Sequence, residues 1–357
     1  MMKLALSLAL IAGASASVKP FPFTQDTSEL LLAETFKNFA EKYGKVYSSE
    51  EERLSRYYIF AQNVQNAAAK NAELASLGKD QVHGITKFSD MTKEEFTSKM
   101  LNPMMSDSIA ASNVSWTTAV PTKSASSGTF DWRDSGVVTD VKNQKYCGSC
   151  WAFSATETVE SQYALNGGSL TELSVQQTVS CDTTDSGCSG GWYYTAWEDY
   201  MEPNGGLALD STYPYDTATA FGHASTCDTT KESEVVSGTT PSSYMWATDT
   251  CSSFRCNNQD EDTLKDNLVS YGPVSIACDA SEWSSYTSGV FSSSDCSSSA
   301  FKLDHAIQLV GYNSEASTPY WIVRNSWDTT WGEDGYIYLE MGVNACGIAD
   351  KAAIVQL

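Results

Sequence analysis

The chain is poor in positive charge and in histidine. It has 22 Lys and Arg residues against 44 Asp and Glu, and its net charge of −22 falls entirely on residues 126–357, because residues 1–125 carry 13 of each sign. A surface this acidic argues against binding to nucleic acid, whose phosphates attract cationic proteins. With only three histidines, few side chains can act as a base near neutral pH.

Long apolar runs are also missing. The run from Leu4 to Ala12 follows Lys3 and is far shorter than the ~20 residues that a membrane-spanning helix needs. Small residues then lead to Ala16, a pattern typical of a secretory signal peptide; the alternative interpretation is a membrane anchor. We therefore expect residues 1–16 to be a signal peptide and most of the ten cysteines to be bridged in an oxidising compartment.

Composition divides the rest of the chain into three segments. Residues 28–77 are charged, rich in Ala, Leu, Glu and Lys and free of proline, which predicts helix. Residues 100–128 are rich in Ser, Ala, Thr and Pro, which is typical of a linker, and contain the sequon for N-glycosylation at Asn113. From Phe130 onward the chain is dense in Trp, Tyr, Gly and Cys. We expect a helical region joined by a cleavable linker to an acidic, disulfide-bonded region, without internal repeats.

The stretch NQKYCGSCWAFSA, residues 143–155, contains two cysteines three positions apart. Cys147 and Cys150 could form a redox couple, half of a zinc site, or a pair with different roles. Residues 149–166 are predicted to form a helix that ends at Gly167-Gly168. Cys150 would then lie at a helix N-terminus, where backbone N–H groups and the helix dipole favour a thiolate. The residues expected on the buried face of this helix are Trp151, Ala155, Val159 and Tyr163.

A cysteine nucleophile needs a base, and the strand pattern favours His305. Strands are predicted at 303–312, 319–327 and 334–341, and a hairpin between the first two is centred near residue 316. That register places Asn325 and Trp327 within one step of the position opposite His305. An amide can orient an imidazole, and an indole can shield their hydrogen bond from water. Without these neighbours, His305 would more simply be a core histidine. His83 lies in the first, helical region, and His223, in a polar run, is expected to be a surface residue.

Acyl transfer also needs a donor to the developing oxyanion. Gln144 lies six residues before Cys150 in the same loop. Its side-chain amide could act there together with the backbone N–H of Cys150. Without these neighbours, Gln144 would be read as an ordinary polar loop residue.

Seven ordered motifs resemble those of the papain-like cysteine proteases, most closely the cathepsin L-like branch. The segment Cys-Gly-Ser-Cys-Trp is a signature of this family. The motifs are DWRDSGVVTDVKNQ (131–144), CGSCWAFS (147–154), CSGGW (188–192), YPY (213–215), GPVS (272–275), DHAI (304–307) and NSWDTTWGEDGY (325–336).

Two further motifs resemble those of the family's pro-region. The first, E-x3-R-x3-F-x2-N-x3-I-x3-N, is present with Ala67 in place of Ile, and the second, G-x-N-x-F-x-D, with Thr86 in place of Asn. The resemblance implies that residues 17–125 are an inhibitory pro-domain and linker, which cover the cleft until acid loosens them. The mature enzyme would comprise residues 126–357, beginning near Ser126. The matching pro-region residues are Glu52, Arg56, Phe60, Asn63, Asn71, Gly84, Phe88 and Asp90.

The resemblance implies an α+β, papain-like two-domain fold with a helical left domain, a β-barrel-like right domain and the active-site cleft between them, preceded by a mainly helical pro-domain. Cys150 would be the nucleophile, His305 the general base and then acid, Asn325 the orienting residue and Gln144 the oxyanion donor. The residues that would contact substrate or shield the site are Gly190, Gly191, Trp327, Asp304, Ala277 and Lys351.

The resemblance also implies the disulfides Cys147–Cys188, Cys181–Cys227 and Cys296–Cys346. Three cysteines remain. We expect a local bridge between Cys251 and Cys256, inside a segment that is longer than usual for the family, and a buried free thiol at Cys278.

Three residues depart from the family's pattern. Lys145 and Asp328 stand where glycine is usual, which puts details of substrate binding in doubt. Lys351 stands at the floor of the pocket that usually receives an apolar P2 side chain of the substrate. It could accept an acidic P2 residue through an ion pair, or it could point to solvent and leave the pocket hydrophobic.

The resulting hypothesis is a zymogen of a cysteine endopeptidase, secreted or lysosomal/vacuolar, that hydrolyses proteins and peptides through a thioester. Paired histidines of the kind found in exopeptidase relatives are missing. We expect a monomer inhibited by its own pro-domain, with no cofactor, no metal, no nucleic-acid partner and no membrane span. The alternatives are a non-catalytic binding or structural protein on the same fold, which the loss of Cys150, His305 or Gln144 would favour, and a scaffold in which Cys150 is bridged.

Overall fold

The computed structural model describes residues 27–102, 105, 114–257 and 259–357. The expected signal peptide and the sequon at Asn113 lie outside the described residues. The chain divides into two compact units, one up to Val46 and one from Tyr47 onward. In the first unit, helix α1 (Thr27–Lys42) carries Phe36 and Phe39, whose rings stack with centroids 5.9 Å apart. The rest of the fold concerns the second unit.

Two helices of the second unit precede the linker. Helix α2 (Glu50–Ser76) is capped by Ser49, whose side chain accepts from the Glu52 N–H, and α3 (Lys93–Met100) begins with a capping box at Thr92. The predicted helical stretch 28–77 is therefore interrupted between Lys42 and Glu50. Ser-x-x-Glu is a helix-start signal, so the start of a second helix after Ser49 could have been predicted from the sequence.

Side chains of the first pro-region motif attach α2 to the segment that follows it. Arg56 donates two hydrogen bonds to Glu95 of α3, at 2.6 and 2.8 Å. Asn63 donates to the carbonyl oxygens of Ser89 and Met91. Polar residues of one helix face thus fix the course of residues 79–100.

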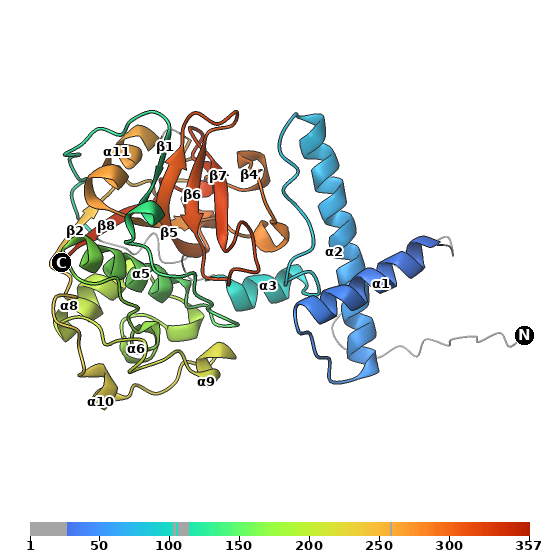
Figure 1. Cartoon of the computed structure of the whole chain (residues 1–357), viewed down its shortest axis with the longest axis horizontal. Helices are drawn as coiled ribbons and strands as arrows, with labels where there is room; N and C mark the ends of the chain where they lie inside the picture. The colour runs from blue at the N-terminus through green and yellow to red at the C-terminus, as the bar shows by residue number, and fades with distance from the viewer. Residues whose placement is uncertain (1–26, 103–104, 106–113, 258) are drawn as a thin grey trace, which may run out of the picture. The chain divides into compact units, whose positions relative to one another are not determined.

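The strands of the described chain form one eight-stranded sheet with the path β2-β8-β3-β5-β6-β7-β4, and β1 pairs with β5 beside that path. Figure 1 shows these strands together in the half of the unit that contains the C-terminal residues. The strands are β1 (Thr129–Asp131), β2 (Ser243–Trp246), β3 (Val274–Cys278), β4 (Val290–Phe291), β5 (His305–Asn313), β6 (Tyr320–Arg324), β7 (Tyr336–Glu340) and β8 (Ala353–Gln356).

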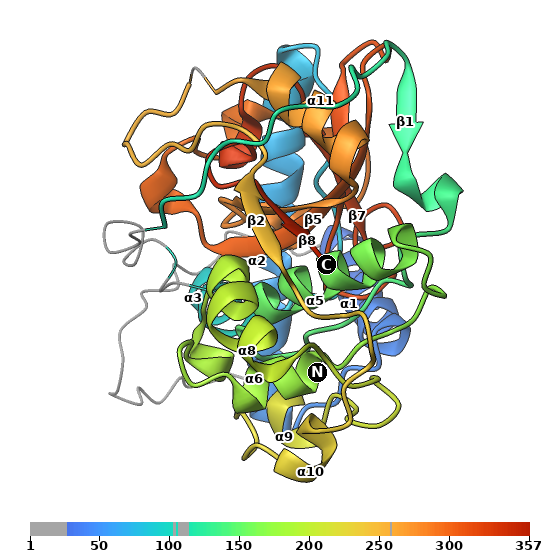
Figure 2. The ribbon, with the colours of Figure 1, turned by 90° about the vertical axis from the view of Figure 1, so that its left-hand side faces the viewer.

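Helix α5 (Cys150–Leu165) lies between the sheet and the smaller helices, against β3, β5 and β8 on one side and α6 and α7 on the other (Figure 2). Its bounds agree with the prediction, but the predicted single buried face is wrong, because every residue from Cys150 to Gln162 is buried and Tyr163 is half-buried. Neighbours on both sides explain this. The other helices of the region are α6 (Val175–Cys181), α7 (Tyr193–Thr195), a π-helix (Ala196–Met201), α8 (Glu202–Asn204), α9 (Thr217–Ala220), α10 (Thr229–Glu232) and α11 (Glu261–Tyr271).

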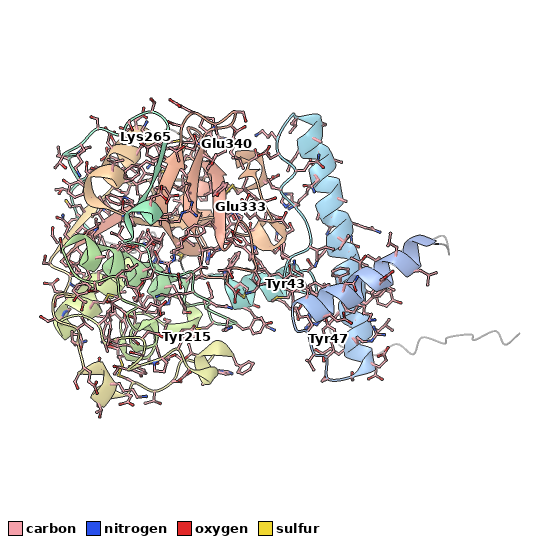
Figure 3. All side chains as sticks on the ribbon, viewed as in Figure 1. Tyr43, Tyr47, Tyr215, Lys265, Glu333 and Glu340 are labelled. Carbon is pink, nitrogen blue, oxygen red and sulfur yellow. A yellow bond between two sulfur atoms is a disulfide. The ribbon has the colours of Figure 1, made fainter. Side chains whose placement is uncertain are left out.

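The apolar core has two main parts. One packs around the sheet and includes Trp283, Trp321 and Trp331, and the other packs around α5 and includes Trp151 and Trp197. Figure 3 places Tyr215 among the helices of the second part, and Glu333 and Glu340 beside the sheet. This is the expected α+β arrangement of a helical half and a β half. Short 3-10 helices lie at Trp132–Ser135, Gly187–Ser189, Trp283–Ser285, Ser293–Asp295, Ala300–Lys302 and Ala345–Gly347.

The cysteine pairing is the predicted one. Disulfides join Cys147 to Cys188, Cys181 to Cys227, Cys251 to Cys256 and Cys296 to Cys346. Cys150 and Cys278 are free and buried. The redox-couple and zinc interpretations of Cys147 and Cys150 are therefore wrong, and so is the alternative in which Cys150 is bridged. Across the described ranges, no helix is both long enough and apolar enough to span a bilayer.

Candidate active site

Cys150 begins α5, and its sulfur lies beside β5. The backbone N–H groups of Ala306 and Trp151 lie near enough to the Cys150 sulfur to lower its pKa. Because Ala306 follows His305 directly, this contact places the thiol next to the histidine backbone. The start of a buried helix and the start of a buried strand thus bring the two residues together.

The His305 ring is oriented by Asn325. The Nε2 atom of His305 lies 2.7 Å from Asn325 Oδ1, and the same oxygen accepts from the Ser326 N–H at 2.8 Å. Since Oδ1 is an acceptor, Nε2 carries the proton of the neutral imidazole. The other ring nitrogen, Nδ1, is buried and has no hydrogen-bond partner among the described residues. It is therefore available as a base.

Trp327 covers this hydrogen bond, as predicted from the hairpin. Its ring stacks on that of His305 with centroids 4.7 Å apart and an interplanar angle of 27°. The observed pairing of Gln308 with Arg324 has the predicted register, which carries position 305 to a place opposite 327. A register shift between Leu309 and Gly311 lies beyond this end of the hairpin. The base, its orienting amide and the indole therefore follow from strand geometry.

Gln144 is fully buried, and its side-chain amide is fixed at both ends. The Oε1 atom accepts from Ser326 Oγ at 2.6 Å and from Trp327 Nε1 at 3.0 Å. The Nε2 atom donates to the carbonyl oxygens of Cys147 and Met100, at 2.8 and 3.0 Å. Gln144 thus presents an N–H donor to a peptide carbonyl of the preceding segment, in the same loop as the thiol.

The segment after α3 occupies the cleft between the two halves. Asn102 donates from its backbone N–H to the Asp304 carbonyl oxygen at 2.6 Å and from Nδ2 to the Gly191 carbonyl oxygen at 2.7 Å. The side chain of Asn102 covers Gly190, where a Cβ would lie only 1.9 Å from Asn102 Oδ1. Residues 100–102 therefore use the same backbone groups that were predicted to bind substrate.

Burial keeps the thiol and the imidazole neutral in this form of the protein. It raises the pKa of Cys150 to about 12, although backbone hydrogen bonds from Ala306, Trp151 and Cys150 oppose the shift. It lowers the pKa of His305 to about 4, against the hydrogen bond to Asn325. Burial thus opposes the thiolate that the helix N-terminus favours. A charged pair would need the hydration that burial denies it.

The remaining predicted substrate-binding residues lie around the same cleft. Ala277 on β3 is fully buried and pairs with Ala306 on β5. Asp304 is half-buried, and desolvation together with the Asp279 charge holds its pKa well above the usual range. Lys351 is only 4% exposed, so the alternative in which it points to solvent is wrong in this form. Its Nζ atom donates to Ser252 Oγ at 3.0 Å and lies over the Trp246 ring.

The two departures at family glycine positions share a backbone property. Lys145 has φ 55° and Asp328 has φ 69°, the left-handed region that glycine occupies most easily. Asn143 joins the two loops, because its Oδ1 accepts from the Lys145 N–H and its Nδ2 donates to Asp328 Oδ2, both at 3.0 Å. The Asn143 side chain thus holds the loop that carries Gln144 against the loop that carries Trp327.

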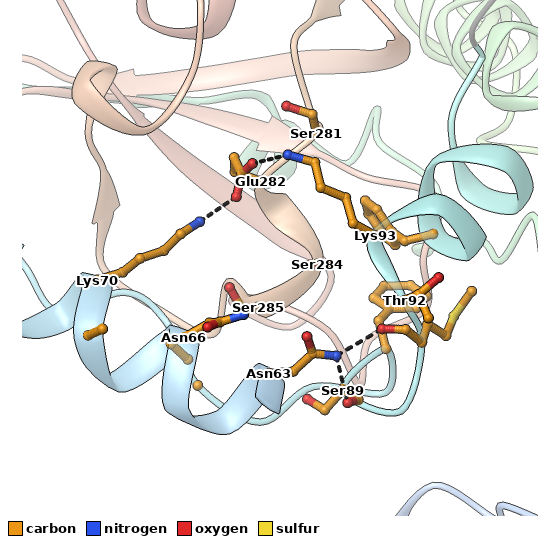
Figure 4. Close-up of a pocket in the computed structure, with 16 residues that line it drawn as sticks. Asn63, Asn66, Lys70, Ser89, Thr92, Lys93, Ser281, Glu282, Ser284 and Ser285 are labelled. Carbon is orange, nitrogen blue, oxygen red and sulfur yellow. Dashed lines mark hydrogen bonds and ion pairs between the residues drawn. The ribbon is translucent and has the colours of Figure 1, made fainter. Parts of the chain in front are cut away.

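A second contact between the pro-region and the rest of the unit surrounds a pocket of about 320 Å³. Lys70 of α2 and Lys93 of α3 both reach the carboxylate of Glu282 across this pocket (Figure 4). Ser281, Ser284 and Ser285, from the same segment as Glu282, also line the pocket. Other contacts across the same interface join Lys79 to Glu340, His83 to Asp295, and Lys87 to the carbonyl oxygen of Trp327.

We expect Glu282→Gln to loosen the pro-region. Although burial raises the pKa of Glu282, hydrogen bonds from Lys70 and Lys93 bring it below its usual value. The docked carboxylate therefore stabilises the contact above the ordinary glutamate pKa, and this contribution is lost as pH falls through the lowered value. Because these groups are partly exposed, the variant should weaken docking by about 1 kcal/mol, roughly fivefold.

The measurement is the half-time of pro-region release between pH 4 and 7, followed by mass spectrometry. Glu282→Gln should shift release towards higher pH, whereas the exposed Glu315→Gln control should follow the parent protein. An unchanged pH dependence in Glu282→Gln would refute a role for this pair of lysines.

The sequence did not reveal several of the residues that build this site. Met100 and Asn102 lie in a segment assigned to the linker, and the hydroxyl of Ser326 orients Gln144. Tyr215, within the YPY motif, donates to the Gln144 carbonyl oxygen at 3.1 Å and contacts Ser149 Oγ at 2.8 Å. The motif marked Tyr215, but only the fold shows what it touches.

The fold and the site together define a cysteine peptidase held inactive by its own N-terminal region. The model of the family described as papain family cysteine protease matches residues 126–356, and that of the cathepsin propeptide inhibitor domain (I29) matches residues 36–96. The chain belongs to the papain family of cysteine proteases and is a zymogen with an inhibitory propeptide.

Individual relatives agree with this assignment. A cysteine proteinase of Trypanosoma brucei brucei is 38% identical over 87% of this chain, which spans 64% of that relative. The viral cathepsin of Orgyia pseudotsugata multicapsid polyhedrosis virus is 36% identical over 91% of this chain and 92% of its own length. The structure of digestive procathepsin L 3 of Tenebrio molitor larval midgut aligns with this chain over 92% of this chain and 99% of that structure's chain, with a TM-score of 0.73 and 34% identity.

The four disulfides in a protease of this family indicate the secretory pathway.

Proposed function

We propose that the protein is a cysteine endopeptidase that hydrolyses peptide bonds through a thioester formed on Cys150. The observation that supports this best is the position of Gln144, whose amide N–H donates to the Met100 carbonyl oxygen at 3.0 Å in the cleft. A peptide carbonyl thus already rests on the proposed oxyanion donor. The free Nδ1 atom of His305 and the sulfur of Cys150 supply the remaining groups.

The proposed reaction begins after the pro-region has left. His305 Nδ1 takes the thiol proton, and the sulfur of Cys150 attacks the substrate carbonyl carbon. The resulting oxyanion accepts hydrogen bonds from Gln144 Nε2 and from the Cys150 N–H. His305 then donates its proton to the leaving amine, which yields the thioester, and next removes a proton from the water that hydrolyses it. Asn325 keeps the imidazole in the required tautomer throughout.

Substrate would lie where Asn102 lies now. Asn102 already donates its N–H to the Asp304 carbonyl oxygen and its amide to the Gly191 carbonyl oxygen. A substrate chain can make equivalent backbone contacts by adding a strand at Gly190 and Gly191. The same groups therefore account for both inhibition and substrate binding.

The test is mass spectrometry of the proenzyme after acidification in mild reductant, with a peptidyl epoxide added once processing is complete. Cleavage near Ser126 with the label on Cys150 is expected, and a Cys150→Ser protein should remain uncut and unlabelled. If the parent chain stays uncut, a trace of a second protease is added. A chain that is then cut but neither labelled nor active would contradict the proposal.

We further propose that Lys351 gives the mature enzyme a preference for an acidic P2 residue. Its ammonium group is buried and lacks a carboxylate within ion-pair distance in the part of the chain that the structure describes. Burial lowers its pKa, and only the neighbouring Asp350 opposes this shift. A buried, unpaired cation is costly, so an acidic substrate side chain would compensate it.

Lys351→Ala is therefore expected to lower the ratio of kcat/KM for Asp over Leu at P2 by about tenfold or more. Matched peptides that differ only at P2 give this ratio directly. The surface variant Lys231→Ala should leave it unchanged. An equal ratio in Lys351→Ala and the parent enzyme would show that Lys351 does not read the substrate.

The remaining biological assignments are proposals of the same kind. Disulfides and an inhibitory pro-region suit either a lysosome or vacuole, where acid would release the pro-region, or export from the cell. We expect a monomer that acts on proteins and peptides. Size-exclusion chromatography of the processed enzyme tests the oligomeric state.

A further inference from the structure

Beneath the glycine loop of the cleft lie two neighbouring carboxyl groups, Asp182 and Asp185, which the reaction itself does not use. Asp182 is 6% exposed and ends α6. Its Oδ1 atom accepts from the backbone N–H groups of Thr184 and Asp185, at 2.7 and 3.1 Å. Its Oδ2 atom is buried and meets no conventional donor in the part of the chain that is described.

Asp185 supplies the missing donor if it keeps its proton. The two carboxyl groups adjoin, because the backbone N–H of Asp185 donates to Asp182 Oδ1 at 3.1 Å while Oδ2 of Asp182 stays buried without a partner among the described residues. Two neighbouring carboxyl groups can hydrogen-bond to each other only when one of them is protonated. Asp182 already has two backbone donors, so the shared proton belongs to Asp185.

Asp185 also holds the peptide unit that lines the cleft. Its Oδ1 accepts from the Trp192 N–H at 3.1 Å, and its Oδ2 accepts from Thr195 Oγ1 at 2.7 Å. The Trp192 N–H and the Gly191 carbonyl belong to one trans peptide bond and therefore point in opposite directions. Binding the N–H on one side thus aims the carbonyl at the other side, where it accepts from Asn102 Nδ2.

Glycine at position 191 is part of this arrangement. A Cβ there would lie 2.6 Å from both Cγ and Oδ1 of Asp185. The carboxyl group therefore packs directly against the glycine backbone. No side chain separates the carboxyl pair from the surface that binds substrate.

The surroundings favour retention of the proton. Burial raises the pKa of both groups, and the Asp182 charge raises that of Asp185 further. The π-helix that packs beside them contributes Asp199, another acid, and Tyr200, whose pKa the Asp182 charge raises in turn. No cation is among the principal influences on either carboxyl group in the described residues.

We propose that Asp185, through one proton shared with Asp182, is a positioning residue that directs the Gly191 carbonyl towards the substrate backbone, and that this hold weakens when the proton is lost. This inference rests on the proposed use of Gly191 in substrate binding. Because the native pKa is raised, the stabilising effect is complete in acid and declines as pH rises above the ordinary aspartate range. The two adjacent carboxylates then repel each other.

The consequence for catalysis is a change in KM rather than in kcat, because the pair does not touch the reacting atoms. For the processed enzyme, KM should rise by about fivefold between pH 5.5 and 8, the factor of one neutral hydrogen bond. Asp185→Asn keeps an acceptor for Trp192 and adds a permanent N–H donor for Asp182, so its KM should be nearly independent of pH. Asp185→Ala should show a raised KM at both pH values.

Titration of Cys150 and His305 affects the parent and the variants alike. The KM of each variant divided by that of the parent at the same pH therefore isolates the effect of the carboxyl pair. Asp134→Asn removes an exposed carboxylate elsewhere and should follow the parent at every pH. If Asp185→Asn shows the same rise in KM as the parent, the shared proton does not position Gly191.

A second measurement does not depend on peptidase activity. Amide hydrogen exchange of residues 184–195 is compared between the full-length chain and its Asp185→Asn variant at pH 5.5 and 8. We expect equal protection at pH 5.5 and about fivefold faster exchange in the parent at pH 8. An inactive protein that still shows this difference would refute the proposed function alone, whereas equal exchange at both pH values would refute the role of the carboxyl pair.

Discussion

Gln144→Ala is expected to lower kcat for peptide hydrolysis by about 10²–10³-fold while KM stays within about twofold. The buried Nε2 atom of Gln144 points at a peptide carbonyl in the zymogen, and the same N–H would meet the oxyanion of the reacting substrate. Its orientation does not depend on substrate, because Ser326 and Trp327 hold Oε1 from the other side. A fixed donor of this kind acts mainly on the charge that develops in the transition state.

The control is Ser326→Ala, which removes one of the two hydrogen bonds that orient Gln144 and leaves the donor itself in place. We expect it to lower kcat by about tenfold or less. Steady-state kinetics on one peptide amide substrate, with active sites titrated by the epoxide label, gives kcat and KM for the parent enzyme, Gln144→Ala and Ser326→Ala. If Gln144→Ala loses less activity than Ser326→Ala, the oxyanion must be stabilised elsewhere.

The parts of the site that sequence could predict are those fixed by local periodicity. The centre of one hairpin placed Asn325 and Trp327 beside His305, and the structure has the same register at Gln308 and Arg324. A glycine pair and an apolar repeat gave the bounds of α5, and hence the position of Cys150 at its start. Both patterns involve residues close in sequence, so no knowledge of tertiary packing was needed.

The three family disulfides could not be predicted from local sequence patterns. Each of the three family bridges closes a loop of more than 40 residues, and neither spacing nor composition selects one pairing over another. Only the resemblance to a known family supplied them. The short Cys251–Cys256 bridge, with a separation of 5 residues, was predicted only after the resemblance had assigned the other pairs.

What sequence could not predict depends on contacts between distant segments. Asn102 resembles any polar linker residue until the cleft places it against Gly190 and Asp304. The raised pKa of Cys150 has the same origin, because backbone N–H groups at the helix start lower it as expected but burial outweighs them. The left-handed backbone at Lys145 and Asp328 could have been suspected, since glycine is usual at both positions.

The largest expected effect on stability comes from Arg324, which the sequence did not mark. Its guanidinium is fully buried. It donates to Gln308 Oε1, Thr139 Oγ1 and the Asp140 carbonyl oxygen, and it lies 3.5 Å from Glu157 Oε1. These contacts join β5 and β6 to α5, behind the catalytic residues.

Arg324→Leu is expected to lower the free energy of unfolding by about 3–5 kcal/mol at pH 8, because it leaves the Glu157 carboxyl group buried without its cation. Burial already raises the pKa of Glu157 to about 7, with the Arg324 charge opposing the shift. Because the native pKa is raised, the contribution of Glu157 to the free energy of unfolding is complete below the ordinary glutamate pKa and is lost as pH rises through the native pKa. Without Arg324 the pKa rises further, so the loss should be smaller at pH 5, where Glu157 is protonated in both proteins.

Urea unfolding of the full-length chain, with Cys150→Ser in every protein to prevent self-digestion, measures the difference at the two pH values. The double variant Glu157→Gln with Arg324→Leu removes both charges. It should recover part of the lost stability, and the remaining loss should be the same at both pH values. Arg133→Leu, which breaks the partly exposed ion pair with Asp131, serves as the matched control and should cost about 1 kcal/mol or less. A loss in Arg324→Leu that is the same at pH 5 and pH 8 would mean that packing, and not the unpaired carboxyl group, sets the stability of this part of the core.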